Sequence, residues 1–415
     1  MGCGQAVPRR LDKQAGVNPL RQPWTRSKAN AAGASSRPTL RVAAVSDRKS
    51  FDAFLRVPFR VFRGDPNWVP PLLIERRQAL DPGKNPYFAH AEARYWIAER
   101  GGEPVGRVSA QVDRAYLDRH GDATGHFGLL DGEDDPEAFG ALLAVAEGWL
   151  RERGMRRATG PFSLSINEES GLLVDGFATP PMLLMGHARP YYRAHLERAG
   201  YRKCKDLHAY WHDMGTPVPA AIARLLERLR ANPRIALRPL RRARYREDLA
   251  TALAIFNDAW SGNWGFVPLT EAEIAHVAAS LRPLIEEELV WFAEVDGAPA
   301  AMAVLLPNLN EAIADLDGRL LPFGWIKLLW RLKARRPATA RVPLMGVRKA
   351  HNGSALGGAL ALAVIDAARR GALRAGIRHV EMSWVLEDNL AMRRIIDRIG
   401  ARRYKTYRVY EKALV

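Results

Sequence analysis

A mixed α/β fold that occurs twice along the chain is predicted by three features of the sequence. The chain has 415 residues, whereas single domains have about 100–200 residues. A segment near residue 96 reappears 195 positions later, and strand-like and helix-like stretches follow both copies in the same order. That order, with a hairpin followed by alternating strands and helices, predicts in each half a mixed, twisted sheet flanked by helices.

The repeat is clearest in a segment of nine residues. Residues 96–104 and 291–299 align without a gap and share a Trp, an Ala, a Glu, a Gly and a Pro. In both copies a turn at Gly102 or Gly297 separates two strand-like stretches. Each copy is therefore predicted to form a β-hairpin.

The elements around each hairpin also correspond. A helical stretch and a related Asn-Trp phrase precede each hairpin, and an Ala-rich helix, a strand and a short helix ending at a glycine follow it. In the first half these are 67–72, 140–154, 158–165 and Gly200, and in the second half 263–269, 357–371, 379–385 and Gly400.

The repeat sets the expected domain boundaries. Residues 1–39 are predicted to be a disordered basic arm, because they are rich in Pro, Gly, Ser and basic residues and lack apolar periodicity. An N-terminal domain is expected over 40–214 and a C-terminal domain over 234–415. Turn residues followed by a helical stretch predict a linker helix over 215–233.

Charge and cysteine content narrow the classes of function. The net charge of +17 predicts attraction to anions such as phosphate-bearing cofactors, acidic membrane surfaces or nucleic acid, although a general preference for Arg would also produce it. The two cysteines, Cys3 and Cys204, exclude a disulfide framework and make a metal cluster implausible, so no metal is expected. No apolar stretch is long enough to span a membrane, and we expect a soluble cytoplasmic protein.

A phosphate-binding loop is predicted between a strand and a helix of the second half. The strand 342–347 precedes a run of Asn, Gly, Ser and Ala residues that opens the helix. Glycines let the backbone approach a phosphate closely, and the free N–H groups and dipole of a helix N-terminus attract negative charge. The predicted cofactor-binding residues of this loop are Val347, Asn352, Gly353, Ser354, Ala355, Gly357 and Gly358.

This loop resembles the pyrophosphate loop of the GNAT acetyltransferase superfamily, which follows the pattern Arg/Gln-x-x-Gly-x-Gly/Ala. Gly353, Ala355 and Gly357 fall on its small-residue positions, while Asn352 stands where Arg is common. The resemblance implies two tandem GNAT-like domains and acyl-CoA as the co-substrate.

A second family phrase follows downstream at 389–401 and matches in spacing. The resemblance implies that Asn389 faces the CoA arm. Ile396 stands at the position of the tyrosine that often protonates the leaving thiolate in this superfamily, so a general acid must come from elsewhere or is not used. Tyr404 is a candidate, although its alternation with Tyr407 and Tyr410 is equally typical of sheet packing.

The first half lacks a comparable loop. Its strand 126–130 is followed by an acidic run, 131–137, whose carboxylates would repel a pyrophosphate but suit a helix N-terminus. CoA is therefore expected to bind only to the second half, and the first half to lie on the acceptor side.

Polar residues of the first half are candidates for proton transfer from an amine acceptor. A carboxylate with a raised pKa or a neutral His can take that proton, which suggests Glu168, Glu169 and His187 as catalytic residues. Alternatively, the two glutamates belong to a solvated loop and His187 packs at a strand end. The predicted substrate-binding residues are Asn167, Tyr191, Tyr192, Asn263, Trp264 and Phe266.

Residues 320–336 form a basic, Trp-rich, strongly apolar stretch. Such a helix can lie in the interface of an anionic membrane, which would make the protein peripheral. It can also be a lid over an acyl tunnel or an ordinary buried helix.

Three phrases, 66–71, 161–169 and 263–268, resemble the tandem GNAT-like proteins that include bacterial ceramide synthases. The resemblance covers roughly 40–415 and implies transfer of a fatty acyl group from acyl-CoA to the amine of a sphingoid base, 3-oxosphinganine or sphinganine. Neither cysteine lies in a candidate site, so direct attack without an acyl-enzyme is expected.

Other functions remain open at this stage. The acceptor can be a different amine, or the protein can resemble Fem-type aminoacyl-transferring, RNA-associated proteins. No RNA-reading motif with interleaved aromatic residues occurs, so nucleic acid is not expected as a partner. A non-catalytic acyl-CoA sensor would follow if both halves lacked a working acid and base.

Overall fold

The computed structural model of the protein describes residues 38–282 and 284–414. Two compact units, Met1–Pro38 and Thr39–Val415, divide the chain. The predicted basic arm, 1–39, lies outside the described residues except for residues 38 and 39.

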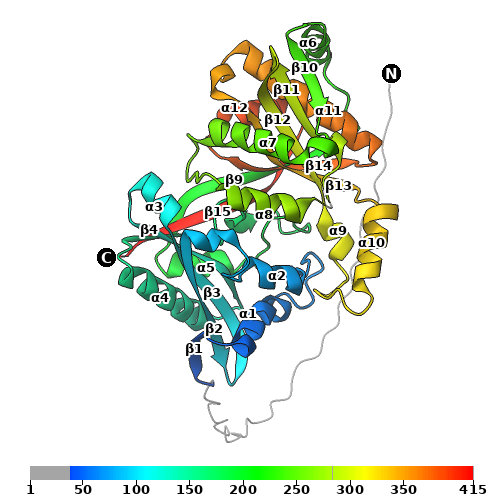
Figure 1. The fold of residues 1–415 in the computed structure, drawn as a ribbon. Coiled ribbons are helices and arrows are strands. Elements are labelled where there is room, and N and C mark those ends of the chain that lie inside the picture. The colour runs from blue at the N-terminus through cyan, green and yellow to red at the C-terminus, as the bar shows by residue number, and fades with distance from the viewer. Residues whose placement is uncertain (1–37, 283, 415) are drawn as a thin grey trace, which may run out of the picture. The chain divides into compact units, whose positions relative to one another are not determined.

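The first half of this unit alternates strands and helices as the sequence predicted (Figure 1). Its elements are β1 (Leu40–Ala44), α1 (Arg48–Val61), α2 (Leu73–Ala79), η1 (Pro86–Ala89), β2 (Ala91–Arg100), β3 (Glu103–Asp113), α3 (Arg114–His120), β4 (Thr124–Gly132), α4 (Pro136–Glu152), β5 (Arg157–Gly160), β6 (Phe162–Ser163), β7 (Glu169–Ser170), β8 (Leu172–Asp175), α5 (Tyr192–Arg198) and β9 (Arg202–Asp213).

The second half repeats that order with insertions. Its elements are α6 (Ala220–Arg230), β10 (Ile235–Pro239), η2 (Arg242–Arg244), α7 (Tyr245–Trp260), α8 (Glu271–Leu281), η3 (Glu287–Leu289), β11 (Val290–Val295), β12 (Ala298–Pro307), α9 (Leu309–Ile313), α10 (Gly324–Ala334), β13 (Thr339–Val347), η4 (Lys349–His351), α11 (Ala355–Arg374), β14 (His379–Leu386), α12 (Leu390–Arg398) and β15 (Arg402–Ala413).

Both predicted hairpins are confirmed. The strands β2 and β3 form one, and β11 and β12 form the other. Their two-residue turns, Gly101-Gly102 and Asp296-Gly297, have positive φ at both positions. This conformation matches the twist of a hairpin and strongly favours glycine, which explains why the glycine recurs in the repeat.

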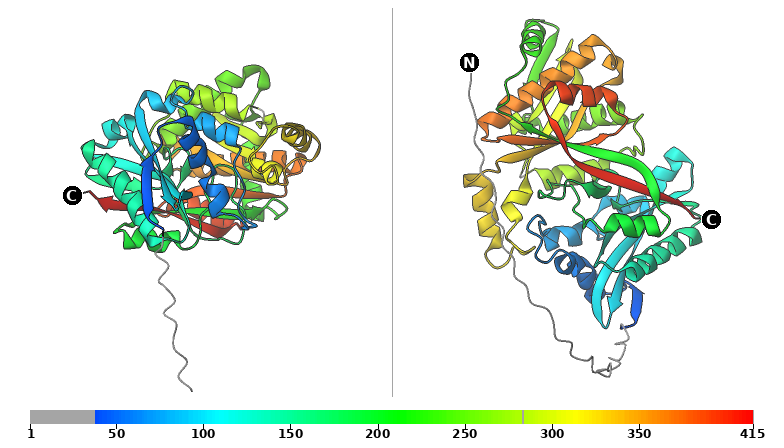
Figure 2. Two further views of the ribbon diagram at one scale, coloured as in Figure 1. Left: turned by 90° about the horizontal axis from the view of Figure 1, so that it is seen from below. Right: turned by 180° about the vertical axis from the view of Figure 1, so that it is seen from behind.

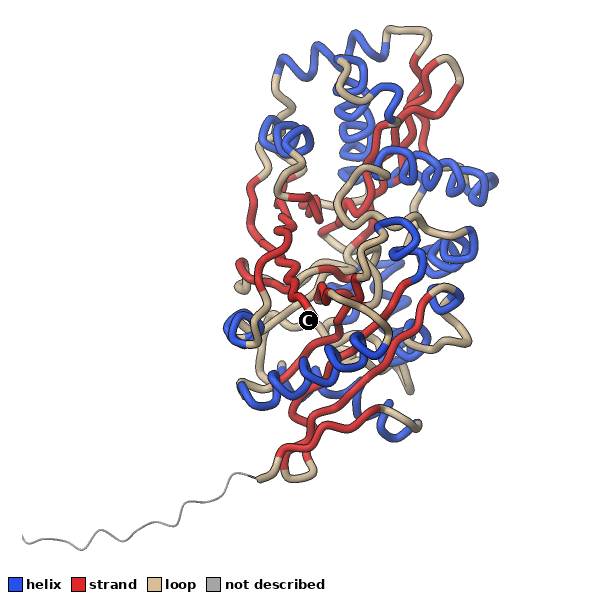
Figure 3. The backbone as a smooth tube through the Cα atoms, turned by 90° about the vertical axis from the view of Figure 1, so that its left-hand side faces the viewer, coloured by secondary structure: helices blue, strands red, loops and turns tan. Residues whose placement is uncertain are grey.

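Strands from both halves form one sheet within the described residues. This 13-stranded sheet has the order β1-β2-β3-β4-β5-β15-β9-β14-β13-β12-β11-β10, with β8 also paired to β15. Pairing is antiparallel except between β4 and β5 and between β13 and β14. Helices lie along both faces of the strands (Figure 3), as the predicted fold class requires.

The halves exchange their last strands. Strand β9 ends the first half but pairs with β14 of the second, and β15 ends the chain but pairs with β5 of the first. The two exchanged strands also pair with each other, and Figure 2 shows them side by side. Backbone hydrogen bonds thus join the two repeats, a connection that the repeat itself did not indicate.

Helices cover both faces of the central strands of each repeat. Nearly all of β3 is buried, because both α1 and α4 pack against it, and β12 is buried in the same way against α7 and α11. Strands buried on both faces anchor the core of a domain. The parallel pairs β4–β5 and β13–β14 lie next to these anchors.

Candidate active site

Each parallel strand pair is hydrogen-bonded at one end only. Residues 124–126 of β4 pair with 157–159 of β5, and 339–342 of β13 pair with 379–382 of β14. Beyond these residues neither ladder continues: β5 ends at Gly160, and β13 and β14 separate. The separation of β13 and β14 is where the second half holds its cavity.

This cavity has a volume of about 820 Å³ and is lined by residues of β13, β14, α6, α7, α11 and α12. The volume falls within the range of pockets that hold drug-sized ligands, about 300–1,000 Å³. Most of the predicted cofactor-binding residues line it, namely Val347, Asn352, Gly353, Ser354, Gly357, Gly358 and Asn389. Ala355, the first residue of α11, is exposed and is not part of the lining.

The predicted phosphate loop forms the N-terminus of α11. The Ser354 hydroxyl caps this helix by accepting a hydrogen bond from the Gly357 N–H at 2.9 Å, and the first turn contains no acidic residue. A Cβ at Gly357 would lie 2.1 Å from the His351 carbonyl oxygen, so this glycine is required for the loop to close. A Cβ at Gly358 would meet open space. The loop therefore presents a helix N-terminus free of carboxylates to the cavity.

Asn389 begins α12 on the cavity wall. Its side-chain oxygen accepts a hydrogen bond from the Met392 N–H at 3.1 Å. Ile396, on the same helix, is 1% exposed and also lines the cavity. The position at which the superfamily often has a tyrosine thus contributes apolar surface here.

The predicted acceptor phrase of the second half reaches the same cavity. Asn263 and Trp264 line it, together with Trp260, whose indole N–H donates to the Met345 carbonyl of β13 at 3.1 Å. Phe266 does not line the cavity, because it is buried against the Phe256 ring at a centroid distance of 5.5 Å.

Residues of the first half hold this acceptor loop in place. The Asn167 amide donates to the Val267 carbonyl at 3.1 Å, and a ring nitrogen of His120 lies 3.1 Å from the Phe266 carbonyl. Arg119 donates to the Ser261 carbonyl. Among the predicted substrate-binding residues of the first half, Asn167 is therefore the one bonded to the acceptor loop.

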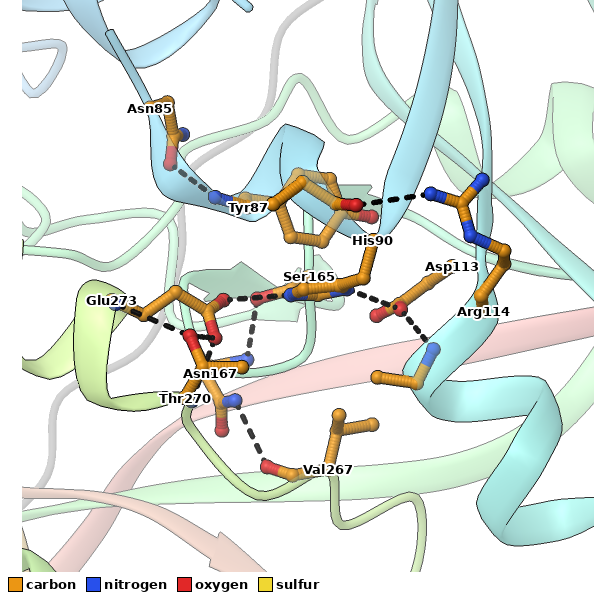
Figure 4. A network of polar contacts seen from close by, with 12 residues as sticks. Asn85, Tyr87, His90, Asp113, Arg114, Ser165, Asn167, Val267, Thr270 and Glu273 are labelled. Carbon is orange, nitrogen blue, oxygen red and sulfur yellow. Dashed lines mark hydrogen bonds and ion pairs between the residues drawn. The ribbon is translucent and has the colours of Figure 1, made fainter.

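A second link to the first half lies just after this loop (Figure 4). The His90 ring lies between two carboxylates, with Nδ1 at 2.9 Å from Asp113 and Nε2 at 3.4 Å from Glu273 of α8. Glu273 also closes a capping box with Thr270 at the start of α8. The helix that follows the acceptor loop is thus fixed to the first half.

Glu168 and Glu169 lie in the first half, away from the cavity lining. The Glu168 carboxylate accepts a hydrogen bond from the Leu164 N–H at 3.3 Å, and Glu169 pairs with Arg76 at 3.3 Å. Burial raises the pKa of Glu168 to about 8, against the opposing effect of the Arg76 guanidinium. Glu168 therefore has the proton affinity of a base near neutral pH but does not contact the cavity.

His187, Tyr191 and Tyr192 also belong to the first half and do not line the cavity. The His187 Nε2 lies 3.1 Å from an Asp65 carboxylate oxygen, and burial lowers its pKa. The Tyr191 hydroxyl donates to the Gly132 carbonyl at 2.8 Å, and the Tyr192 hydroxyl accepts from the Gly132 N–H at 3.0 Å. The two tyrosines thus bind the end of β4.

Tyr404 belongs to a buried polar network that reaches the cavity through another residue. Its hydroxyl donates to Glu381, which is fully buried, and burial followed by this carboxylate raises the pKa of Tyr404. The Ser383 hydroxyl also donates to Glu381 and accepts from the Arg341 Nε at 2.8 Å. Ser383 also lines the cavity, so this residue lies between the cavity and the buried carboxylate.

Sequence reasoning did not single out Ser383, Trp260 or the α6 residues. Ser383 and Trp260 lie outside the phrases that resemble the family, and each lines the cavity only because distant elements meet there. Among the described residues, no group of three or more His, Cys, Asp or Glu side chains is placed to hold a metal ion.

Two known proteins are similar to this chain over most of their own lengths. The bacterial ceramide synthase of Caulobacter vibrioides is 49% identical over 381 residues, which cover 92% of this chain and 99% of that protein. Protein YghO of Escherichia coli is 46% identical over 369 residues, which cover 89% of this chain and 94% of that protein. No family model matches the chain.

Solved structures share the fold. A tandem GNAT protein from the clavulanic acid biosynthesis pathway has a TM-score of 0.52 at 15% identity, with 91% of this chain and 99% of that chain covered. A GCN5-related N-acetyltransferase from Sphaerobacter thermophilus has a TM-score of 0.51 at 15% identity, with coverages of 90% and 96%. Likeness at this identity shows the tandem GNAT fold, while the closer relatives show the family. The chain belongs to the bacterial ceramide synthase family and is an N-acyltransferase.

Proposed function

We propose that the protein transfers a fatty acyl group from acyl-CoA to the amine of a sphingoid base, 3-oxosphinganine or sphinganine. One observation carries this proposal: a single cavity joins the carboxylate-free N-terminus of α11 to the acceptor loop with Asn263 and Trp264. The relative with the name bacterial ceramide synthase, 49% identical over nearly its whole length, supports the choice of substrate.

The donor side of the cavity suits the phosphates of CoA. Ser354 occupies one N–H of the first helical turn, and the neighbouring N–H groups and the helix dipole favour an anion. Gly353 and Gly358 leave open space for close approach. Val347 ends β13, Asn389 begins α12, and both line the cavity. The pantetheine arm of CoA would lie between these two residues.

On the acceptor side, the neutral amine attacks the thioester carbonyl, an amide bond forms, and the CoA thiolate leaves. The amine nitrogen must lose one proton in this step. Ser383 is the cavity residue best connected to a buried carboxylate, since it can take that proton while passing its own to Glu381. Glu168, Glu169, His187 and Tyr404 remain candidates, of which Tyr404 acts through Glu381.

A lipid acceptor requires contact with a membrane, and we assign this contact to residues 320–336. None of the helices in the described residues is long and apolar enough to cross a membrane. However, α10 and its approach expose Leu321 (78%), Phe323 (73%) and Trp330 (56%), and Lys333 and Arg335 are also exposed. Apolar side chains beside cations suit an interface of anionic lipids.

Flotation with anionic vesicles tests the membrane contact. Phe323→Glu combined with Trp330→Glu is expected to reduce binding at least about tenfold, because two large apolar side chains no longer enter the interface. Equal flotation of this variant and the wild type contradicts the assignment.

The main test incubates the protein with palmitoyl-CoA and sphinganine and identifies the amide by mass spectrometry. Gly358→Asp is expected to lower its formation by at least about 100-fold, because a carboxylate then occupies the open space beside the phosphates. Gly358→Ala is the matched control and retains activity. Gly357 is unsuitable for this purpose, since any side chain there displaces the His351 carbonyl. Amide formation that is absent from the wild type, or equal in both Gly358 variants, contradicts the proposal.

A further inference from the structure

Beyond the phosphate loop the cavity forms an arm lined mainly by apolar side chains, with Arg369, Arg394 and Arg398 among its other lining residues. Residues of α6, α11, α12 and β14 line this apolar arm. Figure 1 labels these four elements. Its apolar lining residues are Val218, Ile222, Leu226, Leu362, Ile365, Val380, Met382, Ile395, Ile396 and Ile399.

Helix α6, which connects the two repeats, forms one wall of the apolar arm. Leu226 and Leu229 are buried against Leu362 and Ala363 of α11, and Ile222 packs against the same cluster. Ile222 and Leu226 are four residues apart and so share one face of the helix. Leu225, which does not line the cavity, is exposed. The connector is thus packed onto the catalytic half by the face that lines the arm.

The polar groups beside the apolar arm are largely occupied or neutral. Asp366 pairs with Arg230 at 2.6 Å and with Arg370, and the Arg369 guanidinium donates to the Thr216 carbonyl at 3.1 Å. His212 is 6% exposed, and burial, assisted by Arg369, lowers its pKa, so the ring is neutral at pH 7. An apolar ligand can therefore lie against the apolar side chains without breaking the ion pairs of Asp366 or meeting a charged His212.

The arm is continuous with the donor side of the cavity. Helix α11 contributes lining residues both to the arm and, at Ser354 and Gly358, to the donor side. Helix α12 does the same through Asn389. The acceptor loop, 261–267, belongs to neither helix. An acyl chain that extends from the thioester along α11 and α12 would reach the arm directly. The acceptor would instead lie beside the loop 261–267.

We infer that the apolar arm holds the fatty acyl chain of the donor and that α6 limits its length. This inference rests on the proposed binding of acyl-CoA but not on the identity of the amine. Each buried methylene group strengthens binding roughly fourfold. The enzyme is therefore selective for long acyl chains because the connector between its repeats provides the wall of their binding site.

Calorimetric binding of palmitoyl-CoA and acetyl-CoA tests this inference without requiring turnover. The wild type is expected to bind palmitoyl-CoA at least about 100-fold more tightly than acetyl-CoA. Ile222→Trp fills the arm from α6 and is expected to weaken palmitoyl-CoA binding at least about tenfold, with acetyl-CoA affinity within about twofold of wild type. Leu225→Trp, the matched control on the exposed surface of α6, leaves both affinities unchanged.

A second variant and a stability measurement distinguish filling of the apolar arm from unfolding of the protein. Ile395→Trp fills the arm from α12, and thermal unfolding identifies which variants are folded. The inference is overturned if every folded arm variant retains wild-type affinity for palmitoyl-CoA, or if the wild type does not prefer the long chain.

Titration with sphinganine distinguishes the two possible alkyl chains. If Ile222→Trp weakens sphinganine binding and leaves palmitoyl-CoA binding intact, the arm holds the acceptor tail and the inference is overturned. Failure of the wild type to acylate sphinganine contradicts only the proposed acceptor, because the binding measurements stand independently of it.

Discussion

The parallel strand pairs β4–β5 and β13–β14 occupy equivalent places in the two repeats but have opposite contents. In both pairs the hydrogen-bonded ladder stops partway along the strands. Beyond it, β13 and β14 lead into the 820 Å³ cavity, whereas the chain that follows β5 lies against β4. We call the space beyond the ladder β4–β5 the first slot and the space beyond the ladder β13–β14 the second slot. The difference teaches that the fold provides a slot in each repeat, and that the connections around it decide whether a ligand can enter.

The first slot is filled by the segment after β5. Its Phe162 carbonyl lies so close to Gly128 of β4 that a Cβ there would be 1.6 Å away. The buried Gln111 amide fixes this segment by donating to the Phe162 and Leu164 carbonyls at 2.9 and 2.8 Å. Because the chain runs from residue 161 to 191 before α5 begins, it has enough length to fold back into the slot.

The second slot stays open because its connection is short. Strand β14 ends at Leu386 and α12 begins at Leu390, so no segment is available to fold back. The N-termini of α4 and α11 also differ, because one helix has a charged cap and the other a neutral cap. Asp135 caps α4 with a carboxylate that also pairs with Arg100 at 2.8 Å, whereas the neutral Ser354 caps α11.

A loss of CoA affinity is expected from giving α11 the cap of α4. Ser354→Asp retains a good N-cap but places a carboxylate at the phosphate site, and we expect CoA affinity to fall at least about tenfold, or about 1.4 kcal/mol. Ser354→Asn is the matched neutral control and keeps wild-type affinity. Calorimetry gives the affinities. Equal values for the Asp and Asn variants would show that the caps do not explain the difference between the slots.

The reverse change at α4 is expected to affect stability alone. Asp135→Ser removes the buried carboxylate that pairs with Arg100, and we expect a lower free energy of unfolding, measured in urea. Glu137→Gln, which removes an exposed partner of Arg100, has a smaller effect. CoA still binds at one site per chain, because Phe162 and the two tyrosines on Gly132 fill the first slot. A second CoA site in Asp135→Ser contradicts this explanation.

A pH-dependent effect on stability is expected from the segment that fills the first slot. The pKa of Glu168 is raised from 4.5 to about 8, so the folded state keeps a proton that the unfolded state releases between these values. The associated stability is complete below pH 4.5 and is lost as the pH rises through 8. Glu168→Gln is therefore expected to gain about 4 kcal/mol relative to wild type between pH 5 and 8.5.

Unfolding in urea at both pH values measures this gain. A stability difference between Glu168→Gln and wild type that does not change with pH would contradict the buried environment of Glu168. The same variant tests catalysis, since loss of acylation while binding of palmitoyl-CoA persists would identify Glu168 as the proton acceptor in place of the Ser383–Glu381 pair.

Local patterns were sufficient to predict the hairpins, the repeat and the phosphate loop. Gly102 and Gly297 indicate a turn conformation that strongly favours glycine, and Ser354 with the glycines around it indicates the start of a helix. Each of these patterns lies within a few residues. The acceptor phrase at Asn263 and Trp264 was found because it recurs in both halves. Phe266 belongs to the same recurring phrase but is buried in the core. The sequence does not distinguish a residue that lines the cavity from one that packs in the core.

The sequence by itself determined the tandem α/β fold, the family and the half that presents a carboxylate-free helix N-terminus, because periodicity, turn residues and charge act over short distances along the chain. Only the tertiary structure decided that β9 and β15 exchange partners, that Ser383 links the cavity to Glu381, and that α6 forms a wall of the apolar arm. These features depend on contacts between residues far apart in the sequence, and no local pattern records which distant segments come together in the packed protein.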